Sequence, residues 1–412
     1  MVERTNSMTK CLLCAHASLE ILLDLGCTGL ANNLPSGSDL SSEATYPLRL
    51  ARCPRCTHVQ LADRVDPSAM FQNYLYVSSA SSTLTRHLSS LADAIVPVAP
   101  CLDGSMSLDI GSNDGTLAAC FRAAGYRAMG IDPAENLAPL ARSKGVHVEV
   151  DYFGLDAAHR LARDHGRARV VTATNSFPHI PAIHDYAEGI STLLDHDGVF
   201  VLEAHYLLDL LEQCAFDTIY HEHCHYWRLQ PMLDLFAAHG LEVFDCERLP
   251  IHHGQLRVWV QHTGARPVSA RVQDLLAAEE TAGLGTQAPF ESFAKRASVI
   301  RTSLRDSLRE LRRIGQKVAG YGAPAKASTL AAWCGLTTSD LMWIADKNPL
   351  KHGRFTPGSH IPIVPVDRVE ADRPNVLLLL AWNFASEIMQ ELDSYRTQGG
   401  KFLIPVPEVR LA

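Results

Sequence analysis

Short apolar runs alternate with helix-like stretches along most of the chain. The first set of apolar runs falls at residues 107–110, 128–131, 168–173 and 198–203, after a helical stretch at 84–98. The second set falls at 317–321, 341–345, 376–380 and 402–406, after an amphipathic helix. In that helix Phe293, Ile300, Leu304, Leu308 and Leu311 recur at helical spacing. Strands that alternate with helices predict parallel sheets covered by helices, so the expected fold class is α/β with two Rossmann-like sheets.

The pattern divides the chain into three segments. Residues 1–80 contain two pairs of cysteines around a Pro/Gly/Ser-rich stretch, residues 81–265 hold the first α/β set, and residues 266–412 hold the second. A length of 412 residues suits two or three domains. We therefore expect a small cysteine-containing module followed by two α/β domains.

Charge and hydropathy narrow the class of partner. The chain has 37 basic and 45 acidic residues, a net charge of −8, without a block of about five or more like charges. The longest apolar stretch, residues 376–381, is far shorter than the roughly 20 residues of a membrane span, and residues 1–7 lack the apolar region of a signal peptide. We expect a cytoplasmic monomer or weak homo-oligomer that binds a small molecule rather than a nucleic acid or a membrane.

Four of the 11 cysteines form two C-x-x-C pairs, Cys11 with Cys14 and Cys53 with Cys56. Each pair presents two sulfurs to one tetrahedral ion, and four thiolates leave no open position for water, which is typical of structural zinc. A redox C-x-x-C pair is the alternative, but it usually stands singly beside a βαβ pattern, as neither pair does. The sequence predicts one structural Zn²⁺. Disulfides are not expected, because the number of cysteines is odd and several others lie in apolar patterns.

A glycine turn follows the first apolar run of the middle segment. Residues 109–115 read D-I-G-S-N-D-G, and an acid ends the next run about 20 residues later. The glycines let the backbone approach a ligand, and the acid can accept hydrogen bonds from both ribose hydroxyls. The turn lacks the middle glycine of G-x-G-x-x-G, which favours S-adenosylmethionine over NAD. The candidate cofactor-binding residues are Asp109, Gly111, Asn113, Gly115, Asp132 and Asn175, the last at the end of the third run.

The stretch with the most varied chemistry is residues 220–227, which read Y-H-E-H-C-H-Y-W. In an extended segment His221, His223 and His225 would share one face, as metal ligands could. Acid–base catalysis is the more economical interpretation, because histidine titrates near neutral pH and can remove a carbon-bound proton. A packed polar loop without a chemical role is the third interpretation.

A second glycine turn lies in the C-terminal segment. Residues 317–329 read K-V-A-G-Y-G-A-P-A-K-A-S-T, which predicts a strand, a turn and the start of a helix. Free backbone N–H groups together with Lys326 would suit a diphosphate. The two α/β segments resemble each other in a way that is typical of a duplication.

Taken in this order, the motifs resemble those of the sugar C-methyltransferases of deoxysugar biosynthesis. The resemblance rests on the C-x-x-C pairs, on residues 109–115, 175–181 and 220–223, and on residues 320–326 and 357–363. It covers nearly the whole chain, and the order of the motifs is specific even where a single motif is not. It implies a zinc-binding N-terminal domain, a class I methyltransferase domain that uses S-adenosylmethionine, and a Rossmann-like C-terminal domain.

The same resemblance implies a reaction and the residues that perform it. The family acts on a nucleotide-linked 4-keto-6-deoxysugar, expected here to carry dTDP: a base removes a proton next to the ketone, and the enolate takes the methyl group. His223 matches the general base, with Tyr220 and Glu222 orienting or stabilising, and with His179 and Tyr76 as further polar groups of the pocket. The expected substrate-binding residues are Tyr321, Lys326, His252 and Arg257.

Two departures from the family pattern concern the pocket. His253 and Gln255 stand where the family usually has glycine and serine, which predicts a narrower or more polar pocket. Ala327 follows Lys326 where the family commonly has glycine, which alters backbone access to a phosphate.

Three alternatives to the proposed function stay open: a non-sugar acceptor, an NAD(P)-dependent oxidoreductase, and a zinc-ribbon regulator. Carbons C3 and C5 both flank a C4 ketone, so the methylated carbon is also open.

Overall fold

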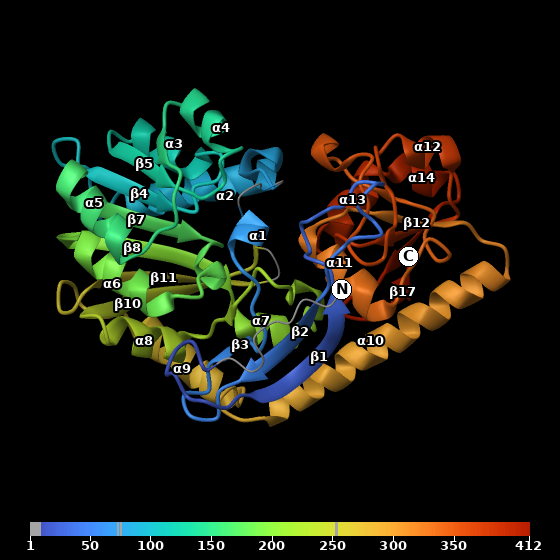
Figure 1. Ribbon diagram of the computed structural model, residues 1–412, viewed down its shortest axis with the longest axis horizontal. Coiled ribbons are helices and arrows are strands. Elements are labelled where there is room, and N and C mark those ends of the chain that lie inside the picture. Colours follow the sequence, from blue (N-terminus) through green and yellow to red (C-terminus); the bar gives the residue numbers. More distant parts are fainter. Residues whose placement is uncertain (1–9, 72–73, 75, 252–253) are drawn as a thin grey trace.

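The computed structural model describes residues 10–71, 74, 76–251 and 254–412, and three sheets organise them (Figure 1). The N-terminal sheet contains β1 (Glu20–Thr28), β2 (Tyr46–Arg52) and β3 (Val59–Leu61) in antiparallel order. Its fourth strand, β9 (His225–Tyr226), comes from the histidine-rich stretch and pairs with β3. The cysteine-containing N-terminal segment therefore shares a sheet with the histidine-rich stretch at residues 220–227.

The middle sheet has seven strands in the order β10-β11-β8-β7-β4-β5-β6. Its strands are β4 (Met106–Ile110), β5 (Arg127–Ile131), β6 (His147–Glu149), β7 (Ala168–Thr174), β8 (Leu194–His205), β10 (Leu241–Leu249) and β11 (Gln255–His262). The first five are parallel, and β11 and β10 complete the sheet antiparallel to their neighbours. All four strands expected from the sequence are confirmed, although β8 is longer than expected at both ends.

Helices cover the middle sheet. They are α2 (Ser82–Ile95), α3 (Thr116–Ala123), α4 (Ala138–Ser143), α5 (Leu155–His165), α6 (Ile183–Leu193), α7 (Leu207–Glu212) and α8 (Leu229–Ala237). The strand order reverses at β4, where β5 lies on one side and β7 on the other. In open α/β sheets a ligand binds at such a reversal, beyond the carboxyl ends of the strands. The candidate cofactor turn begins at that end of β4.

The C-terminal sheet has six strands in the order β14-β13-β12-β15-β16-β17. They are β12 (Val318–Tyr321), β13 (Ile344–Ala345), β14 (Ile363–Val364), β15 (Val376–Leu379), β16 (Lys401–Ile404) and β17 (Arg410–Leu411). The second Rossmann-like sheet is thus confirmed, with α11 (Ala325–Cys334) directly after the glycine turn. The strand expected at 341–345 is shorter, because Leu341 closes a turn with its N–H bonded to the Thr337 carbonyl.

The long helix α10 (Ala288–Arg313) joins the parts of the molecule. It packs against β1, α7, α11 and β12, and in Figure 1 it runs along the lower edge from the N-terminal sheet toward the C-terminal one. Its buried side includes Phe293, Ile300, Leu304 and Leu308, as the helical spacing predicts. The preceding helix α9 (Ala270–Thr281) packs on β10. No helix within these described ranges is long and apolar enough to cross a bilayer.

Candidate active site

A cavity of about 960 Å³ opens at the carboxyl edge of the middle sheet. All three segments line it. The N-terminal segment contributes Tyr76, the middle segment contributes Asp132 and His223, and the C-terminal segment contributes Lys326. A cavity of this size is at the upper end of small-molecule sites.

One wall of the cavity is the glycine turn after β4. Gly111 has a φ of +72°, and Asp132 lies close by at the end of β5. The Asp132 carboxylate accepts hydrogen bonds from the backbone N–H groups of Asn113 and Ala134, each at 2.8 Å. Each oxygen keeps a free lone pair for a ribose hydroxyl. The turn therefore has the form that a nucleoside-containing cofactor requires.

The remaining candidate cofactor residues differ in their surroundings. Asp109 is buried under the turn, where burial raises the pKa of its carboxyl to about 7 and Thr172 donates a hydrogen bond. Asn175 lines the cavity with a φ of +58°. Gly115 lies outside the lining that the described residues form, because it precedes α3 and faces Ala141. Its role in this structure is close packing between helices.

We expect Gly111→Ala to lower the free energy of unfolding by about 2–4 kcal/mol. The added Cβ would lie 2.5 Å from the Ser176 Cβ, and alanine is strained at this positive φ. Gly104→Ala is the matched control, since its φ is +69° and the added Cβ would meet nothing within 4 Å. That control should lose only about 1 kcal/mol. Equal losses in urea denaturation of the two variants would contradict the close approach at Gly111.

His223 lies in the cavity wall with one ring nitrogen fixed. Its Nδ1 donates a hydrogen bond of 2.8 Å to the Thr218 carbonyl, which leaves Nε2 as the unprotonated nitrogen. No hydrogen bond joins Nε2 to another described residue. Burial, with a smaller contribution from His179, lowers the pKa of His223 to about 3. The imidazole is therefore neutral, oriented and available to accept a proton at physiological pH.

Other rings surround His223. The centroid of Tyr220 is 4.0 Å from it, and those of His179 and His205 are 5.2 and 4.9 Å away. His179 stacks in turn on Phe71 of the N-terminal segment at 5.3 Å. His205 was not among the sequence candidates. It lies at the carboxyl end of β8, so a polar residue just after the predicted strand was the signal that could have identified it.

Glu222 lies outside the cavity lining that the described residues form and binds two residues of the N-terminal segment that belong to that lining. Its carboxylate accepts hydrogen bonds from the Asn32 amide at 2.7 Å and the Tyr74 hydroxyl at 3.0 Å. Burial raises the pKa of Glu222 to about 7, and these two hydrogen bonds oppose the rise. Because Glu222 is not part of the lining formed by the described residues, we assign it to holding the N-terminal segment beside His223.

The stability of the fold should depend on pH through Glu222. Its pKa rises from 4.5 to about 7 on folding, so between these values the native state binds more protons than the unfolded state. The free energy of unfolding should therefore fall by up to about 3 kcal/mol as pH rises from 4.5 to 7. The buried Asp109 carboxyl, whose pKa is also raised to about 7, adds a fall of its own over this range. Glu222→Gln preserves the shape without the charge and should therefore remove the share of the fall that belongs to Glu222, and leave that of Asp109. Urea denaturation at several pH values measures it, and an unchanged slope in the variant would contradict the assignment.

The other two histidines of residues 220–227, His221 and His225, bind partners different from those of His223. His221 Nε2 binds the Pro47 carbonyl at 3.1 Å, and His225 binds His58 through Nδ1 and the Ile180 carbonyl through Nε2. The turn at residues 220–223, closed by the hydrogen bond from the His223 N–H to the Tyr220 carbonyl, breaks the extended conformation that a shared face requires. In the parts of the chain that are described, the four cysteines are the one group arranged to hold a metal ion. The histidines are thus not brought together as metal ligands.

Of the expected substrate-binding residues, Lys326 reaches the cavity. Its Nζ lies 4.1 Å from the centre of the Trp382 ring, and burial lowers its pKa to about 8, against the attraction of Asp217. Tyr321 is buried at the end of β12, outside the described lining. Arg257 is not in that lining either, because Glu203 holds it at 2.7 Å. His252 and His253 lie outside the described residues.

Gln255 acts on the cavity through a neighbour. Its side chain is fully buried and donates a hydrogen bond to the Asn175 Oδ1. The Asn175 amide is thereby oriented with its NH₂ group as the donor left for the cavity. Gln255, which stands where the family usually has serine, therefore fixes the side chain of Asn175 and does not itself narrow the pocket.

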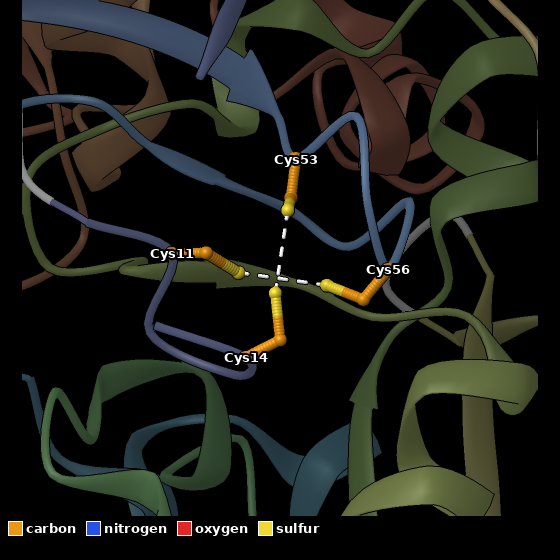
Figure 2. A group of neighbouring side chains, drawn as sticks. All are labelled: Cys11, Cys14, Cys53 and Cys56. Carbon is orange, nitrogen blue, oxygen red and sulfur yellow. Dashed lines mark hydrogen bonds between the residues drawn. The ribbon is translucent and has the colours of Figure 1, made fainter. Parts of the chain in front are cut away.

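The four cysteines of the C-x-x-C pairs converge on one point (Figure 2). Sγ of Cys11 is 3.5 Å from that of Cys56, and Sγ of Cys14 is 3.5 Å from that of Cys53. An ion about 2.3 Å from each sulfur requires neighbouring sulfurs about 3.8 Å apart. The thiolate-only donor set fits structural zinc.

Both C-x-x-C turns follow the same backbone path. The N–H of the first cysteine binds the carbonyl five residues later, of His16 in one turn and His58 in the other. The residues that let the chain double back, Ala15 and Thr57, have φ values of +56° and +59°. This shared path explains why two short, distant sequence pairs form one site.

Comparison with known proteins gives matches along the whole chain. Three family models match: a zinc binding domain over residues 11–71, a methyltransferase domain over residues 84–245, and a C-methyltransferase C-terminal domain over residues 250–407. The C-methyltransferase NovU of Streptomyces niveus is 36% identical over 413 residues, which covers 100% of this chain and 98% of NovU. A ubiquinone biosynthesis O-methyltransferase of Bordetella parapertussis is 34% identical over 89 residues, 21% of this chain and 37% of that protein.

Solved structures of methyltransferases also match part of the chain. Magnesium protoporphyrin IX methyltransferase (ChlM) of Synechocystis PCC 6803, with bound S-adenosylmethionine, is 13% identical and covers 43% of this chain and 79% of its own, at a TM-score of 0.33. An S-adenosylmethionine-dependent methyltransferase of Clostridium acetobutylicum is 13% identical and covers 44% of this chain and 92% of its own, at a TM-score of 0.36.

Proposed function

The chain belongs to the S-adenosylmethionine-dependent C-methyltransferases that carry a zinc-binding N-terminal domain, and we propose that its acceptor is a nucleotide-linked 4-keto-6-deoxysugar. The proposed nucleotide is dTDP, and the proposed position of methylation is a carbon next to the ketone. The observation that carries the proposal is the neutral, oriented imidazole of His223 in a cavity bounded by the cofactor turn.

His223 is the proposed general base. Its free Nε2 removes the proton from the carbon next to the ketone. The electron pair of that C–H bond forms a C=C bond, while the π electrons of the C=O bond move onto the ketone oxygen and give an enolate. S-adenosylmethionine supplies the electrophilic methyl group that this carbon attacks. The Nδ1–H bond to the Thr218 carbonyl keeps Nε2 as the accepting nitrogen throughout.

The low pKa of His223 is compatible with this role. Burial disfavours the imidazolium in the empty cavity, but an enolate beside it and a diphosphate bound nearby each bring negative charge that stabilises the imidazolium. Tyr220 stacks beside His223 and lines the cavity, and burial keeps the pKa of its phenol far above the ordinary value. Tyr220 is therefore a neutral hydrogen-bond donor suited to the enolate oxygen.

The C-terminal wall is proposed to hold the nucleotide. Lys326 reaches the cavity from the first turn of α11, and Lys351 belongs to the same lining. The Lys351 Nζ donates to the Ala323 carbonyl at 2.8 Å and lies 3.5 Å from Asp346, so Lys326 is the main proposed partner of a diphosphate and Lys351 a second. The opposite wall, with Asp132, is left to the cofactor.

Turnover with a panel of acceptors tests the proposal. The protein is incubated with S-adenosylmethionine and nucleotide-linked 4-keto-6-deoxysugars, and both S-adenosylhomocysteine and the mass of the sugar are measured. A sugar heavier by one methyl group is the expected result, and its fragmentation distinguishes C3 from C5. Methylation of a non-sugar keto compound, with all sugars unchanged, would replace the proposed acceptor. Nicotinamide turnover instead of methyl transfer would overturn the reaction itself.

A further inference from the structure

The last part of the N-terminal segment leads into α2 and contacts the cofactor turn. We call this part, Tyr74 with residues 76–79, the strap. The Asn113 side chain binds the strap twice: Nδ2 donates to the Tyr76 carbonyl at 3.0 Å, and Oδ1 accepts from the Ser78 N–H at 2.9 Å. Asp114 accepts from the Ser79 N–H at 3.2 Å. Neighbouring side chains of the cofactor turn thus fix the strap backbone.

A second asparagine holds the other end of the strap in the same way. Asn136 Nδ2 donates to the Tyr74 carbonyl at 2.8 Å, and its Oδ1 accepts from the Tyr74 N–H at 3.1 Å. Asn136 follows β5, as Asn113 follows β4. The carboxyl edge of the middle sheet therefore uses its polar side chains to bind protein backbone as well as to face the cavity.

The strap carries two groups that bear on the reaction. Tyr76 lines the cavity and keeps 42% of its surface exposed. Tyr74 donates its hydroxyl to Glu222, next to His223 in the chain. A shift of the strap would move Tyr76 and would loosen the hydrogen bond between Tyr74 and Glu222.

Asn113 contacts both the strap and Asp132, the acid expected to bind the ribose of the cofactor. Its backbone N–H binds Asp132 at 2.8 Å, while its side-chain amide is directed to the strap. Its backbone has a φ of +52°, in the left-handed region. The Asn113 side chain is therefore engaged with protein backbone through both its donor and its acceptor.

We propose that Asn113 is a positioning residue for the acceptor, which it serves by holding the strap and hence Tyr76 over the cavity. The inference rests on the proposed function. It also changes the role expected of Asn113 as a cofactor-binding residue: the side-chain amide positions the acceptor site, and only the backbone of Asn113 serves the cofactor. Asn136 supports the same strap from its far end.

Asn113→Gly tests the proposal, because glycine adopts the positive φ without strain and removes the side chain with its amide, while the backbone N–H that binds Asp132 is kept. Losing two hydrogen bonds should lower kcat/KM for the acceptor by roughly 10- to 30-fold. The affinity for S-adenosylhomocysteine, measured by calorimetry, should change by less than about threefold. Backbone hydrogen exchange in a peptide covering residues 76–81 should accelerate by about tenfold or more.

Two further variants complete the test. Asn113→Asp keeps the acceptor for the Ser78 N–H but places a carboxylate oxygen against the Tyr76 carbonyl, which repels it, so its kcat/KM should fall at least as far as that of Asn113→Gly. Asp103→Gly is the matched control: Asp103 is exposed in the loop before β4 with a φ of +44°, and its replacement should leave all three measurements unchanged.

Distinct results overturn the inference. A loss of S-adenosylhomocysteine affinity as large as the loss of kcat/KM would make Asn113 a cofactor ligand. Unchanged exchange at residues 76–81 would show that Asn113 does not hold the strap. If the wild type methylates no keto sugar, the proposed function fails separately, and the exchange measurement still decides whether Asn113 holds the strap.

Discussion

Replacing His223 with asparagine is expected to lower the rate of methyl transfer by about 10³-fold and to leave the affinity for S-adenosylhomocysteine nearly unchanged. The asparagine amide can keep the hydrogen bond that Nδ1 donates to the Thr218 carbonyl, but it has no basic nitrogen in place of Nε2. Single-turnover rates give the loss in the chemical step, and calorimetry gives the affinity.

The matched control for this prediction is His221→Asn. It makes the same substitution two residues earlier, at a buried imidazole that binds the Pro47 carbonyl outside the cavity. We expect it to keep methyl transfer within about tenfold of the wild type. Wild-type turnover by His223→Asn would exclude His223 as the base, and equal losses in the two variants would attribute the effect to packing.

Removing the zinc ligands is expected to abolish both the fold of the N-terminal segment and methyl transfer. In small zinc domains the metal contributes about 10–16 kcal/mol of binding free energy to folding, which four free thiols cannot replace. Asn32, Tyr74 and Tyr76 belong to this segment and reach Glu222 or the cavity. Cys53→Ser should therefore lose zinc, protease resistance of the N-terminal segment, and activity.

Metal analysis and the control variant Cys27→Ser complete the zinc prediction. Cys27 is an exposed cysteine at the end of β1, outside the four-sulfur group. Purified wild type and Cys27→Ser should each contain one zinc per chain, and Cys53→Ser should contain none. Two zinc ions per chain, with one lost on His221→Asn, would instead indicate a catalytic metal. Full activity of zinc-free protein would contradict the structural role.

The parts of the fold that follow from local pattern could be predicted from the sequence. Apolar runs such as 168–173 and 376–380 became β7 and β15, because a strand buried on both faces needs little more than apolar side chains of the right length. The zinc site was also predictable, since the spacing of Cys11 and Cys14 fixes the ligand geometry within a single turn. The strands and each C-x-x-C turn depend on patterns within a few residues, and the pairing of the two turns follows from the four ligands that zinc requires.

The finer assignments could not be predicted because they depend on contacts distant in sequence. Glu222 was expected to orient or stabilise groups beside His223, but its partner Asn32, 190 residues away in the N-terminal segment, could not be predicted. Arg257 was expected in the pocket, but the buried Glu203 on the neighbouring strand binds it. His205 was not predicted as a site residue, because β8 continues two residues beyond the end of the predicted strand. A motif gives a residue its position along the chain, whereas the packed neighbours decide the direction of its side chain.

Deuterium incorporation in the absence of methyl transfer tests the central claim most directly. The acceptor sugar is incubated in deuterated water with the protein and S-adenosylhomocysteine, so that no methyl group is available. Wild type should exchange the hydrogen on the carbon next to the ketone, and His223→Asn should exchange it at the rate of buffer alone. Equal exchange by both proteins would show that another group removes the proton, and would contradict the role of His223.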